Sequence, residues 1–355
     1  MYADIGAKGT DSEFHLNFTG ADNSYGVAAT SPVQLLDQGW SQIFTNPQTT
    51  TNVVEMPSIN GTVKLTDTLA LSGVAYYRHY NQQHVDGNIS NAFPCATVSG
   101  TPPTGACFTN TDGNTILLHD TNGAVITVPD SLDTLGEIDR TSLDSNSYGA
   151  SVQAVDKDKV FGHGNQFLIG GSIDHGTTIW KTNAQLGSFA PGFFVNSDLP
   201  FVGPFGDVCA GFDPTVGTCD DTVGGTDLSD IRPVSISTTN TYYGLFFLDT
   251  LDVTDRLTFT TGGRFNVARL TIDDNTGLAP DLNSEATYWH FNPSAGATYK
   301  VLPGISLYGG FSEGNRAPVP AELACANPDQ PCLLPSFLTN DPPLKQSFRR
   351  LGRLV

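Results

Sequence analysis

The sequence predicts an all-β protein, an antiparallel transmembrane β-barrel of about ten strands, and three observations lead to this prediction. The composition has only 15% charged residues, with 37 glycines and 22 prolines, so it is poor in helix formers and rich in turn formers. Apolar and polar residues alternate along many segments, as in a strand with two different faces. Short polar turns and long connections also alternate, as they do at the two rims of a membrane barrel.

The alternation is clearest in residues 291–301, FNPSAGATYKV, where the odd positions are mostly apolar or aromatic and the even positions are small or polar. The same pattern recurs at 13–19, 166–174 and 256–267. The run at 242–251, YYGLFFLDTL, is apolar on both faces and departs from it. A period of two residues over so many segments indicates strands that separate two environments.

We expect five hairpins, each made of two strands joined by a tight turn. In chain order they pair residues 2–9 with 13–20, 58–66 with 68–81, 145–156 with 165–176, 235–251 with 256–272, and 284–302 with 305–314. The turns are Gly9-Thr10-Asp11, Thr66-Asp67, Asp156-Lys157-Asp158, Val253-Thr254-Asp255 and Pro303-Gly304. The hairpins therefore all turn at one rim of the expected barrel.

Between the hairpins run long connections, at about 21–57, 82–144, 177–234, 273–283 and 315–343. Loops of such length are uncommon in a compact soluble domain. They are ordinary in an outer-membrane barrel, which has short periplasmic turns and long extracellular loops. The first connection also has a helix signal, with Ser31 as the N-cap, Pro32 at the first helical position and Gly39 as the stop.

The net charge of −19 argues against a nucleic-acid partner, because a phosphate backbone requires a basic surface. The sequence also has no run of about 20 apolar residues, which excludes a helical membrane span. Strands that alternate carry only half of the apolar signal per residue, so a span built from strands is compatible with the composition.

The six cysteines form three close pairs, each in a loop rich in Pro, Gly or Thr: Cys95 with Cys107, Cys209 with Cys219, and Cys325 with Cys332. We predict three disulfides, each worth about 2–3 kcal/mol in the entropic account, and free thiols are the alternative. A metal site would need closer spacing and neighbouring histidines. Disulfides indicate an oxidising compartment. The N-terminus has no signal peptide, so we expect the chain to lack its own beginning.

Aromatic residues occur toward the ends of the expected strands, where the interfacial girdles of a barrel would stand. They are Tyr76, Tyr77, Tyr80, Tyr242, Tyr243, Tyr288, Trp289 and Tyr308. Ordinary aromatic packing on a β-sheet accounts for any single one of them equally well.

The run YGGFSEGNRAP at 308–318, followed by Ala321-Glu322-Leu323, resembles the strand and loop signature of TonB-dependent outer-membrane receptors. Other segments look like strands and hairpins of the same family: 13–23, 64–78, 243–246, 254–258 and 261–264. The resemblance covers most of the expected strands. Each motif is degenerate, and the specificity lies in their order and spacing.

The resemblance implies a place in the outer membrane of a Gram-negative bacterium and energised uptake of a scarce nutrient such as siderophore iron, haem, cobalamin or a carbohydrate. The implied partners are a small-molecule ligand, metal chelates included, the membrane lipid, and TonB through an N-terminal region. Such a receptor binds and gates without bond chemistry, so we expect neither an enzyme nor a cofactor. Ligand selectivity would lie in the loops at 82–144 and 177–234.

Polar and aromatic residues at the expected lumen and rim are candidates for ligand contact. They are Tyr76, Arg78, His79, His84, Arg264, Lys300 and Arg316. The histidines, together with His163 and His175, lack the spacing of a metal site, and ordinary surface positions also explain them. Pairing with lumen carboxylates explains the basic residues equally well.

The sequence departs from the family pattern at both ends. We expect residues 1–344 to be a partial receptor barrel, because no plug precedes residue 1 and about ten strands fall short of the roughly 22 of large transporters. Residues 345–355 turn basic and read as a truncated or frame-shifted tail. A partial barrel leaves two unpaired edges, so we expect the isolated chain not to transport.

Two other classes of protein stay open. One is a self-contained small outer-membrane barrel, a pore or a membrane enzyme, and the other is a secreted β-sheet adhesin or binding protein. The letters of Gly310–Gly314 match a G-x-S-x-G nucleophile elbow. An elbow requires a helix directly after the serine, which Pro318 and Pro320 disfavour, so we read this run as the end of a glycine-rich strand.

Overall fold

The computed structural model describes most of the chain. The described residues are 1–26, 31–90, 92–98, 101–109, 115–119, 124–128, 134–190, 193–196, 201–202, 212–213, 218–219, 234–277, 283–319 and 347–354.

One 13-stranded sheet dominates the fold, and eleven of its strands follow one another along a single path. They are β1 (Tyr2–Lys8), β2 (Ser12–Tyr25), β3 (Gln48–Lys64), β4 (Leu69–Ile89), β9 (Leu135–Asp156), β10 (Asn165–Ala190), β15 (Val234–Asp252), β16 (Leu257–Asp274), β17 (Ser284–Leu302), β18 (Ile305–Arg316) and β19 (Ser347–Leu354). Every neighbouring pair along the path is antiparallel. This meander confirms the expected antiparallel all-β architecture and all ten of its strands.

The strand boundaries differ from expectation at the end of the sheet that carries the long connections. β3 begins at Gln48, β4 continues to Ile89, β9 begins at Leu135 and β10 continues to Ala190, so the connections expected at 21–57, 82–144 and 177–234 were drawn too wide. The residues of these strand extensions pair with neighbouring strands, although they lie beyond the part of each strand that alternates. Since both faces carry a mixture of polar and apolar residues there, the period of two residues no longer reveals the strand.

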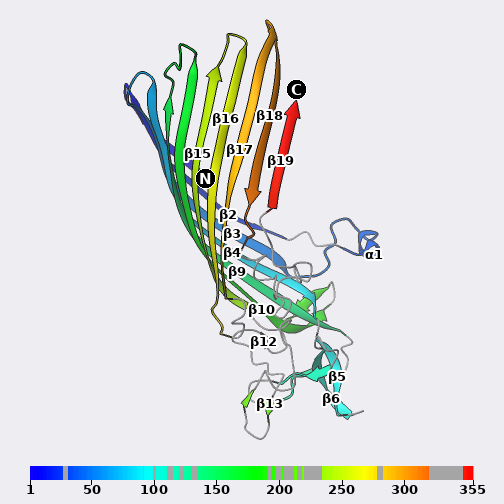
Figure 1. Ribbon diagram of the computed structural model, residues 1–355. Helices are drawn as coiled ribbons and strands as arrows, with labels where there is room; N and C mark the ends of the chain where they lie inside the picture. The colour runs from blue at the N-terminus through cyan, green and yellow to red at the C-terminus, as the bar shows by residue number, and fades with distance from the viewer. Residues whose placement is uncertain are drawn as a thin grey trace.

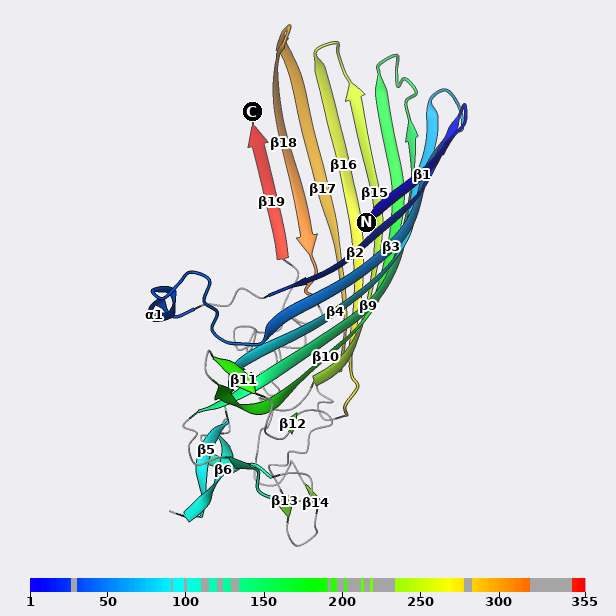
Figure 2. The ribbon, with the colours of Figure 1, turned by 180° about the vertical axis from the view of Figure 1, so that it is seen from behind.

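The sheet is long, strongly curved and open, with β1 and β19 as its outer strands (Figures 1 and 2). The short turns lie together at one end, and the small strands of the long connections lie at the other (Figure 1). Residues 347–354, in the segment expected to be an aberrant tail, form β19 and pair with β18. The origin of that segment stays a prediction.

Smaller elements occupy the long connections. β5 (Phe93–Val98), β6 (Thr101–Thr109), β7 (Thr115–Leu117) and β8 (Thr127–Val128) form a separate sheet, and β13 (Phe212–Asp213) pairs with β14 (Thr218–Cys219). β11 (Phe194–Asn196) and β12 (Phe201–Val202) pair with β10. These short strands were not predicted from the sequence, because two to nine residues carry little periodic signal.

The expected helix is the short α1 (Val33–Leu36). Its N-cap is Pro32, not Ser31, and no side chain caps it. The Ser31 hydroxyl instead donates to the Gln42 carbonyl oxygen at 3.2 Å. No helix among the described residues is long and apolar enough to cross a membrane.

The largest fully buried apolar side chains lie at the end of the sheet with the long connections, in the strand portions that reach it and in the connection that holds Leu118. The largest are Leu118, Leu135, Leu186, Leu270 and Ile272. The rest of the sheet is a single layer that exposes many large apolar side chains. The packed core therefore stabilises the end of the sheet with the long connections, which we call the loop end. The rest of the main sheet, which we call the wall, relies on hydrogen bonds between paired strands.

Candidate functional site

The strand register gives the main sheet two faces of different chemistry. On one of them, the apolar face, Leu16, Ile169, Leu245 and Trp289 are 52–68% exposed. The other, the polar face, carries the alternate residues, such as Asp174. A wall with one apolar and one polar side can separate hydrocarbon from water.

On the polar face, Tyr76 of β4 reaches across β9 to β10. Its hydroxyl donates to Asp174 Oδ1 at 2.8 Å. Gly149 of β9 lies in register between the two residues. A Cβ on Gly149 would lie 2.6 Å from Tyr76 Cε1 and 2.5 Å from Asp174 Oδ1. The tyrosine therefore crosses an intervening strand only because that position has no side chain.

Arg264 of β16 makes a second crossing, over β15 to β10. Its Nη2 donates to Ser172 Oγ at 2.9 Å. A Cβ on Gly244 of β15 would lie 2.6 Å from the Arg264 Cζ. Nε donates to Asn266 Oδ1 at 2.7 Å, and the guanidinium carbon lies 5.3 Å from the centre of the Phe246 ring. These contacts fix Arg264 flat against the polar face.

A hollow of about 420 Å³ lies beside Arg264, and we call it the polar hollow. The amides of Asn266 and Asn292 both donate to Asn315 Oδ1, at 3.0 and 2.7 Å. Asn292 is 9% exposed, and its Oδ1 has no hydrogen-bond partner among the described residues. The polar hollow thus combines a cationic donor with an unused, buried acceptor, which suits a polar ligand or a peptide segment.

Three strands meet at Glu313 of β18. Its side chain is 9% exposed and accepts hydrogen bonds from Arg350 Nε of β19 at 2.6 Å and from His290 Nε2 of β17 at 2.7 Å. Glu313 also lines the polar hollow. Glu313 was not among the residues predicted from the sequence. The signal that could have found it is an acid in a glycine-rich strand, with a basic segment later in the chain.

Arg78 and His84, both expected as ligand contacts, also lie on the polar face. Arg78 Nε donates to Ser147 Oγ at 3.2 Å. His84 Nδ1 lies 2.8 Å from Thr50 Oγ1. Their partners are neutral hydroxyl groups, so Arg78 keeps its charge and most of its donors for another group.

Three candidates remain, and two of them, His79 and Lys300, lie apart from this cluster. His79 is on the apolar face, where its Nδ1 lies 3.1 Å from Asn146 Oδ1. Lys300 is exposed beside the short turn of β17 and β18, and Arg316 is the exposed last residue of β18. Tyr76 of β4 and Arg264 of β16 thus both donate hydrogen bonds to residues of β10. His79 and Lys300 lie away from these contacts. Ligand contact stays a prediction for all seven candidates.

An acidic pair that the sequence analysis missed lies on the polar face at the loop end. The Ser90 hydroxyl donates to Glu137 Oε2, and the Asn88 amide donates to Asp139 Oδ2, both at 2.8 Å. Burial, together with the negative charge of Asp139, raises the pKa of Glu137 to about 7. Burial also raises the pKa of Asp139. The signal was two acids at a spacing of two, which a strand places on one face.

Two long connections are joined to each other near this pair. The backbone amide of Asn46 donates to the Phe193 carbonyl at 2.9 Å, and the amide of Val195 donates to the Asn46 carbonyl at 2.7 Å. The rings of Phe44 and Phe193 meet edge to face at 5.0 Å. The loop between β2 and β3 and the segment after β10 therefore form one unit at the loop end.

The disulfide predicted between Cys95 and Cys107 is confirmed, with a Cα separation of 5.7 Å. It joins β5 to β6 within the connection between β4 and β9. Cys209, Cys325 and Cys332 lie outside the described residues, and so does the side chain of Cys219. Those two pairings stay predictions.

The described residues contain no group of three or more His, Cys, Asp or Glu side chains arranged to hold a metal ion. The G-x-S-x-G letters of 310–314 lie wholly inside β18, which continues to Arg316. Ser312 is therefore in an extended strand and does not have the geometry of a nucleophile elbow.

Comparisons with known proteins agree with this geometry. The family model described as "TonB dependent receptor-like, beta-barrel" matches residues 5–347. A search of curated proteins found no match.

Solved structures with the same fold include the ferric citrate transporter FecA, at 9% identity and a TM-score of 0.56, with 88% of this chain and 35% of that chain covered. The ferric-catecholate import receptor Fiu from Escherichia coli K12 has 10% identity and a TM-score of 0.53, with 97% and 46% covered. BauA, the ferric preacinetobactin receptor of Acinetobacter baumannii, has 12% identity and a TM-score of 0.50, with 88% and 39% covered. The chain spans between about a third and a half of these structures.

Proposed function

Because the chain belongs to the TonB-dependent receptor-like β-barrel family, we propose that it forms part of the wall of an outer-membrane receptor for energised nutrient uptake. The observation that carries the proposal is the division of the sheet into an apolar face and a polar face with a hydrogen-bonded network. The apolar face would contact lipid of the outer membrane, and the polar face would line the lumen. Proteins of this family are transport receptors, so the expected role is binding and gating rather than catalysis.

We propose an iron chelate as the ligand. Two arguments support this class over haem, cobalamin or a carbohydrate. The solved structures that share the fold are named for ferric citrate, ferric catecholates and ferric preacinetobactin. The polar hollow holds the guanidinium of Arg264, which can donate to carboxylate or catecholate oxygens of a chelate, and the Glu313 carboxylate in the same lining is already paired with Arg350 and His290. TonB would supply the energy through the plug that receptors of this family carry.

The number of strands argues for further strands in the working receptor. Because all ten pairings along the path are antiparallel, β1 and β19 run in the same direction. Direct closure of β1 onto β19 would need one parallel seam, whereas an odd number of additional strands restores antiparallel pairing throughout. A receptor wall completed by other strands is therefore favoured over a self-contained pore, and the sheet on its own would not transport.

The experiment that tests the function is uptake of ⁵⁵Fe-labelled chelates by the organism that carries the coding sequence, with and without a deletion of it. We expect the deletion to abolish uptake of one chelate in a panel of citrate, catecholate and hydroxamate complexes. An uncoupler of the proton-motive force should abolish the same uptake in the intact strain. Unchanged uptake of every iron chelate, together with a loss of cobalamin or oligosaccharide uptake, would overturn the iron proposal while keeping the receptor.

The self-contained pore has its own test. The chain refolded in detergent should migrate identically on cold and boiled gels if the sheet is open. Faster migration of the unboiled chain would demonstrate a closed barrel and favour the small pore.

A further inference from the structure

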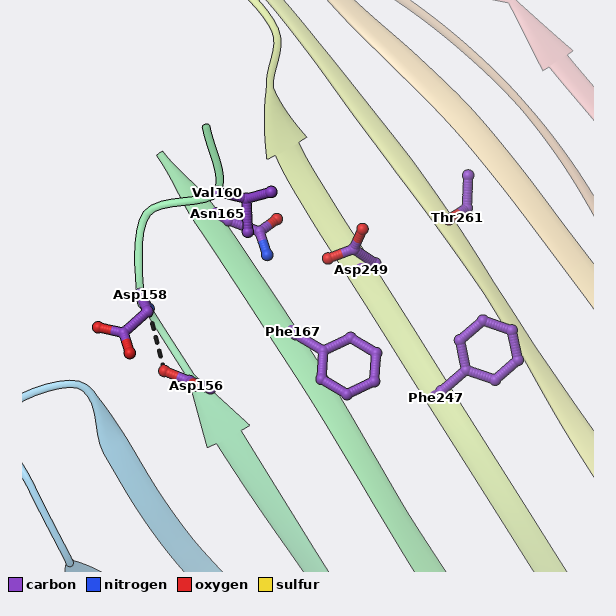
Figure 3. Close-up of a pocket in the computed structure, with 8 residues that line it drawn as sticks. All are labelled: Asp156, Asp158, Val160, Asn165, Phe167, Phe247, Asp249 and Thr261. Atoms are coloured by element: carbon purple, nitrogen blue, oxygen red, sulfur yellow. Dashed lines mark hydrogen bonds between the residues drawn. The ribbon is translucent and has the colours of Figure 1, made fainter. Parts of the chain in front are cut away.

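The apolar face is bordered by polar residues at two levels of β10. Figure 3 shows the border at the short turns, where Asn165 and Asp249 lie beside the ring of Phe167. The next residues of β10 on this face are Ile169, Gly171 and Ile173, and then His175. His175 comes ten positions after Asn165, and a tilted strand needs about 9–11 residues to cross the hydrocarbon of a bilayer. His175 therefore marks the second border of the apolar face, toward the loop end.

Three aromatic side chains form a row at this second border. Tyr77 of β4, Tyr148 of β9 and His175 of β10 are direct neighbours in the strand register. The rings of Tyr148 and His175 lie 5.1 Å apart, with an angle of 36° between their planes. Tyr77 and Tyr148 are 45% and 55% exposed, so the row presents open aromatic surface. It extends over two strand spacings, about 10 Å, and we call it the ring platform.

Hydrogen-bonding groups lie directly beside the ring platform. The Tyr77 hydroxyl donates to Asn146 Oδ1 at 2.6 Å, and His79 Nδ1 lies 3.1 Å from the same oxygen. Asp144 accepts from the amide of Asn146 at 3.2 Å and from that of Asn81 at 3.4 Å, and its side chain is 45% exposed. A carboxylate accepts about four hydrogen bonds. Asp144 therefore has room for hydroxyl donors from outside the protein.

The surroundings of the ring platform distinguish between kinds of headgroup. Among the described strands, the direct register partners of the platform and of the groups beside it include no Lys or Arg, and one of them is the exposed acid Glu55, opposite His79. A phosphate would therefore meet carboxylates without a Lys or Arg to pair with. Quaternary ammonium groups are recognised by a cage of rings, whereas these rings lie side by side and one is an imidazole.

A sugar ring matches both features of the ring platform. One face of a sugar is a layer of C–H groups, which packs on an aromatic ring, and its rim carries hydroxyl groups that donate hydrogen bonds. The open rings of Tyr77 and Tyr148 offer the first contact, and the carboxylate of Asp144 offers the second.

We propose that the ring platform binds the sugar headgroup of a glycolipid in the surrounding membrane leaflet. The sugar would stack on the rings of Tyr148 and His175, and its hydroxyls would donate to Asp144. The source is a lipid rather than a free sugar, because the platform lies at the border of the apolar face, where the headgroups of the adjoining leaflet begin. This inference rests on the proposed function, which places the apolar face against lipid.

Native mass spectrometry of the chain refolded in detergent tests the site. The chain is offered equal amounts of digalactosyldiacylglycerol, phosphatidylethanolamine and phosphatidylglycerol with the same acyl chains. We expect about tenfold more retained glycolipid than either phospholipid, the gain that one or two net hydrogen bonds give. Equal retention of the three lipids, or a preference for a phospholipid, overturns the proposal.

The free headgroup separates the two sources of sugar. Digalactosylglycerol has the same sugars but no acyl chains to hold it at the apolar face, so we expect it not to be retained at the concentration used for the glycolipid. Retention equal to that of the glycolipid would overturn the lipid as the source.

Two variants locate the binding. In Tyr148→Val with His175→Val, which removes the rings but keeps good strand formers, retention of the glycolipid should fall to the level of phosphatidylglycerol. Asp144→Asn keeps the size of the side chain and should lower the preference several-fold. Tyr299→Val is the control, because Tyr299 is a 45% exposed tyrosine on the same face near the short turns, and it should retain the full preference. Circular dichroism confirms equal strand content. A preference that survives both variants overturns the assignment.

The failure of this inference can be told apart from the failure of the proposed function. Insertion into liposomes made of phosphatidylcholine alone requires the apolar face but not the ring platform. A chain that inserts there and shows no preference for the glycolipid refutes only the ring platform. A chain that inserts into no bilayer refutes the membrane location on which both proposals rest.

Discussion

Arg264 of β16 and Ser172 of β10 are joined by a 2.9 Å hydrogen bond although a complete strand, β15, lies between them. Alternate strands of a sheet are about 10 Å apart. The guanidinium covers that distance because Gly244 leaves the surface of β15 flat at the crossing. Tyr76 and Asp174 repeat the arrangement over Gly149, so β10 receives one long side chain from each direction.

A side chain at Gly244 should break the hydrogen bond between Arg264 and Ser172. A Cβ at Gly244 would lie 2.6 Å from Arg264 Cζ and 2.9 Å from Ser172 Oγ, so we expect Gly244→Ala to lower the free energy of unfolding by about 1–3 kcal/mol. Urea unfolding in micelles, followed by tryptophan fluorescence, measures it. Gly171→Ala is the matched control, because the nearest atom to its Cβ would be 3.4 Å away and a strand alanine costs nothing there. Equal effects of the two variants would contradict the role of the crossing.

Removal of the Tyr76 hydroxyl should leave Asp174 without its donor. We expect Tyr76→Phe to destabilise the wall by about 1–3 kcal/mol, because the bond is charge-assisted and partly buried. Tyr77→Phe loses a hydroxyl that donates to Asn146 Oδ1 at 2.6 Å on the exposed side, and should cost about 1 kcal/mol or less. The same urea titration measures the free energy of unfolding of both variants. A larger decrease for Tyr77→Phe than for Tyr76→Phe would show that the Tyr76–Asp174 hydrogen bond is not the stronger of the two.

Stability should fall as the pH rises through the range in which Glu137 loses its proton. Burial raises the pKa of this group from 4.5 to about 7, so between these values the folded state holds more protons than the unfolded state. The stability present below about pH 4.5 is therefore lost progressively up to about pH 7, by at most about 3 kcal/mol.

Glu137→Gln should flatten that pH profile while keeping an acceptor for the Ser90 hydroxyl. Urea midpoints measured from pH 4.5 to 8 give the comparison. The raised pKa of Asp139 leaves a smaller slope of the same sign. Glu285→Gln, an exposed acid, should retain the full slope. A profile that is unchanged in Glu137→Gln would refute the assignment.

Loss of Glu313 should release β19. Its carboxylate accepts from Arg350 Nε at 2.6 Å and is 9% exposed, so Glu313→Ala leaves a strand of arginines facing β18 without a counter-charge. We expect trypsin to cut at Arg349 and Arg350 several-fold faster, because cleavage follows the population of the opened strand. Glu13→Ala, which breaks the pair with Lys8 at the opposite edge, serves as the control. Equal cleavage rates in the two variants would show that Glu313 does not hold β19.

The strands and short turns of the main sheet could be predicted from the local sequence. Residues such as Phe14, Leu16 and Phe18 alternate with polar neighbours, and Pro303-Gly304 fixes a tight turn, so strands and turns followed from short windows of sequence. The residues of the candidate site could be predicted from the sequence only in part. Arg264 was identified as a basic residue on the lumen side, but its partner Ser172, 92 positions earlier, was not.

The sequence by itself determined ten strands of the main sheet, their two faces and the short turns, because the period of two residues and the turn chemistry act between neighbours in the chain. The tertiary structure alone decided which residues meet. Gly149 and Gly244 look in the sequence like weak points of a strand, and only the register places them under Tyr76 and Arg264. The short turn sets the register within the β15–β16 hairpin, but the pairings of β4 with β9 and of β10 with β15 join segments that long connections separate, which no local pattern encodes.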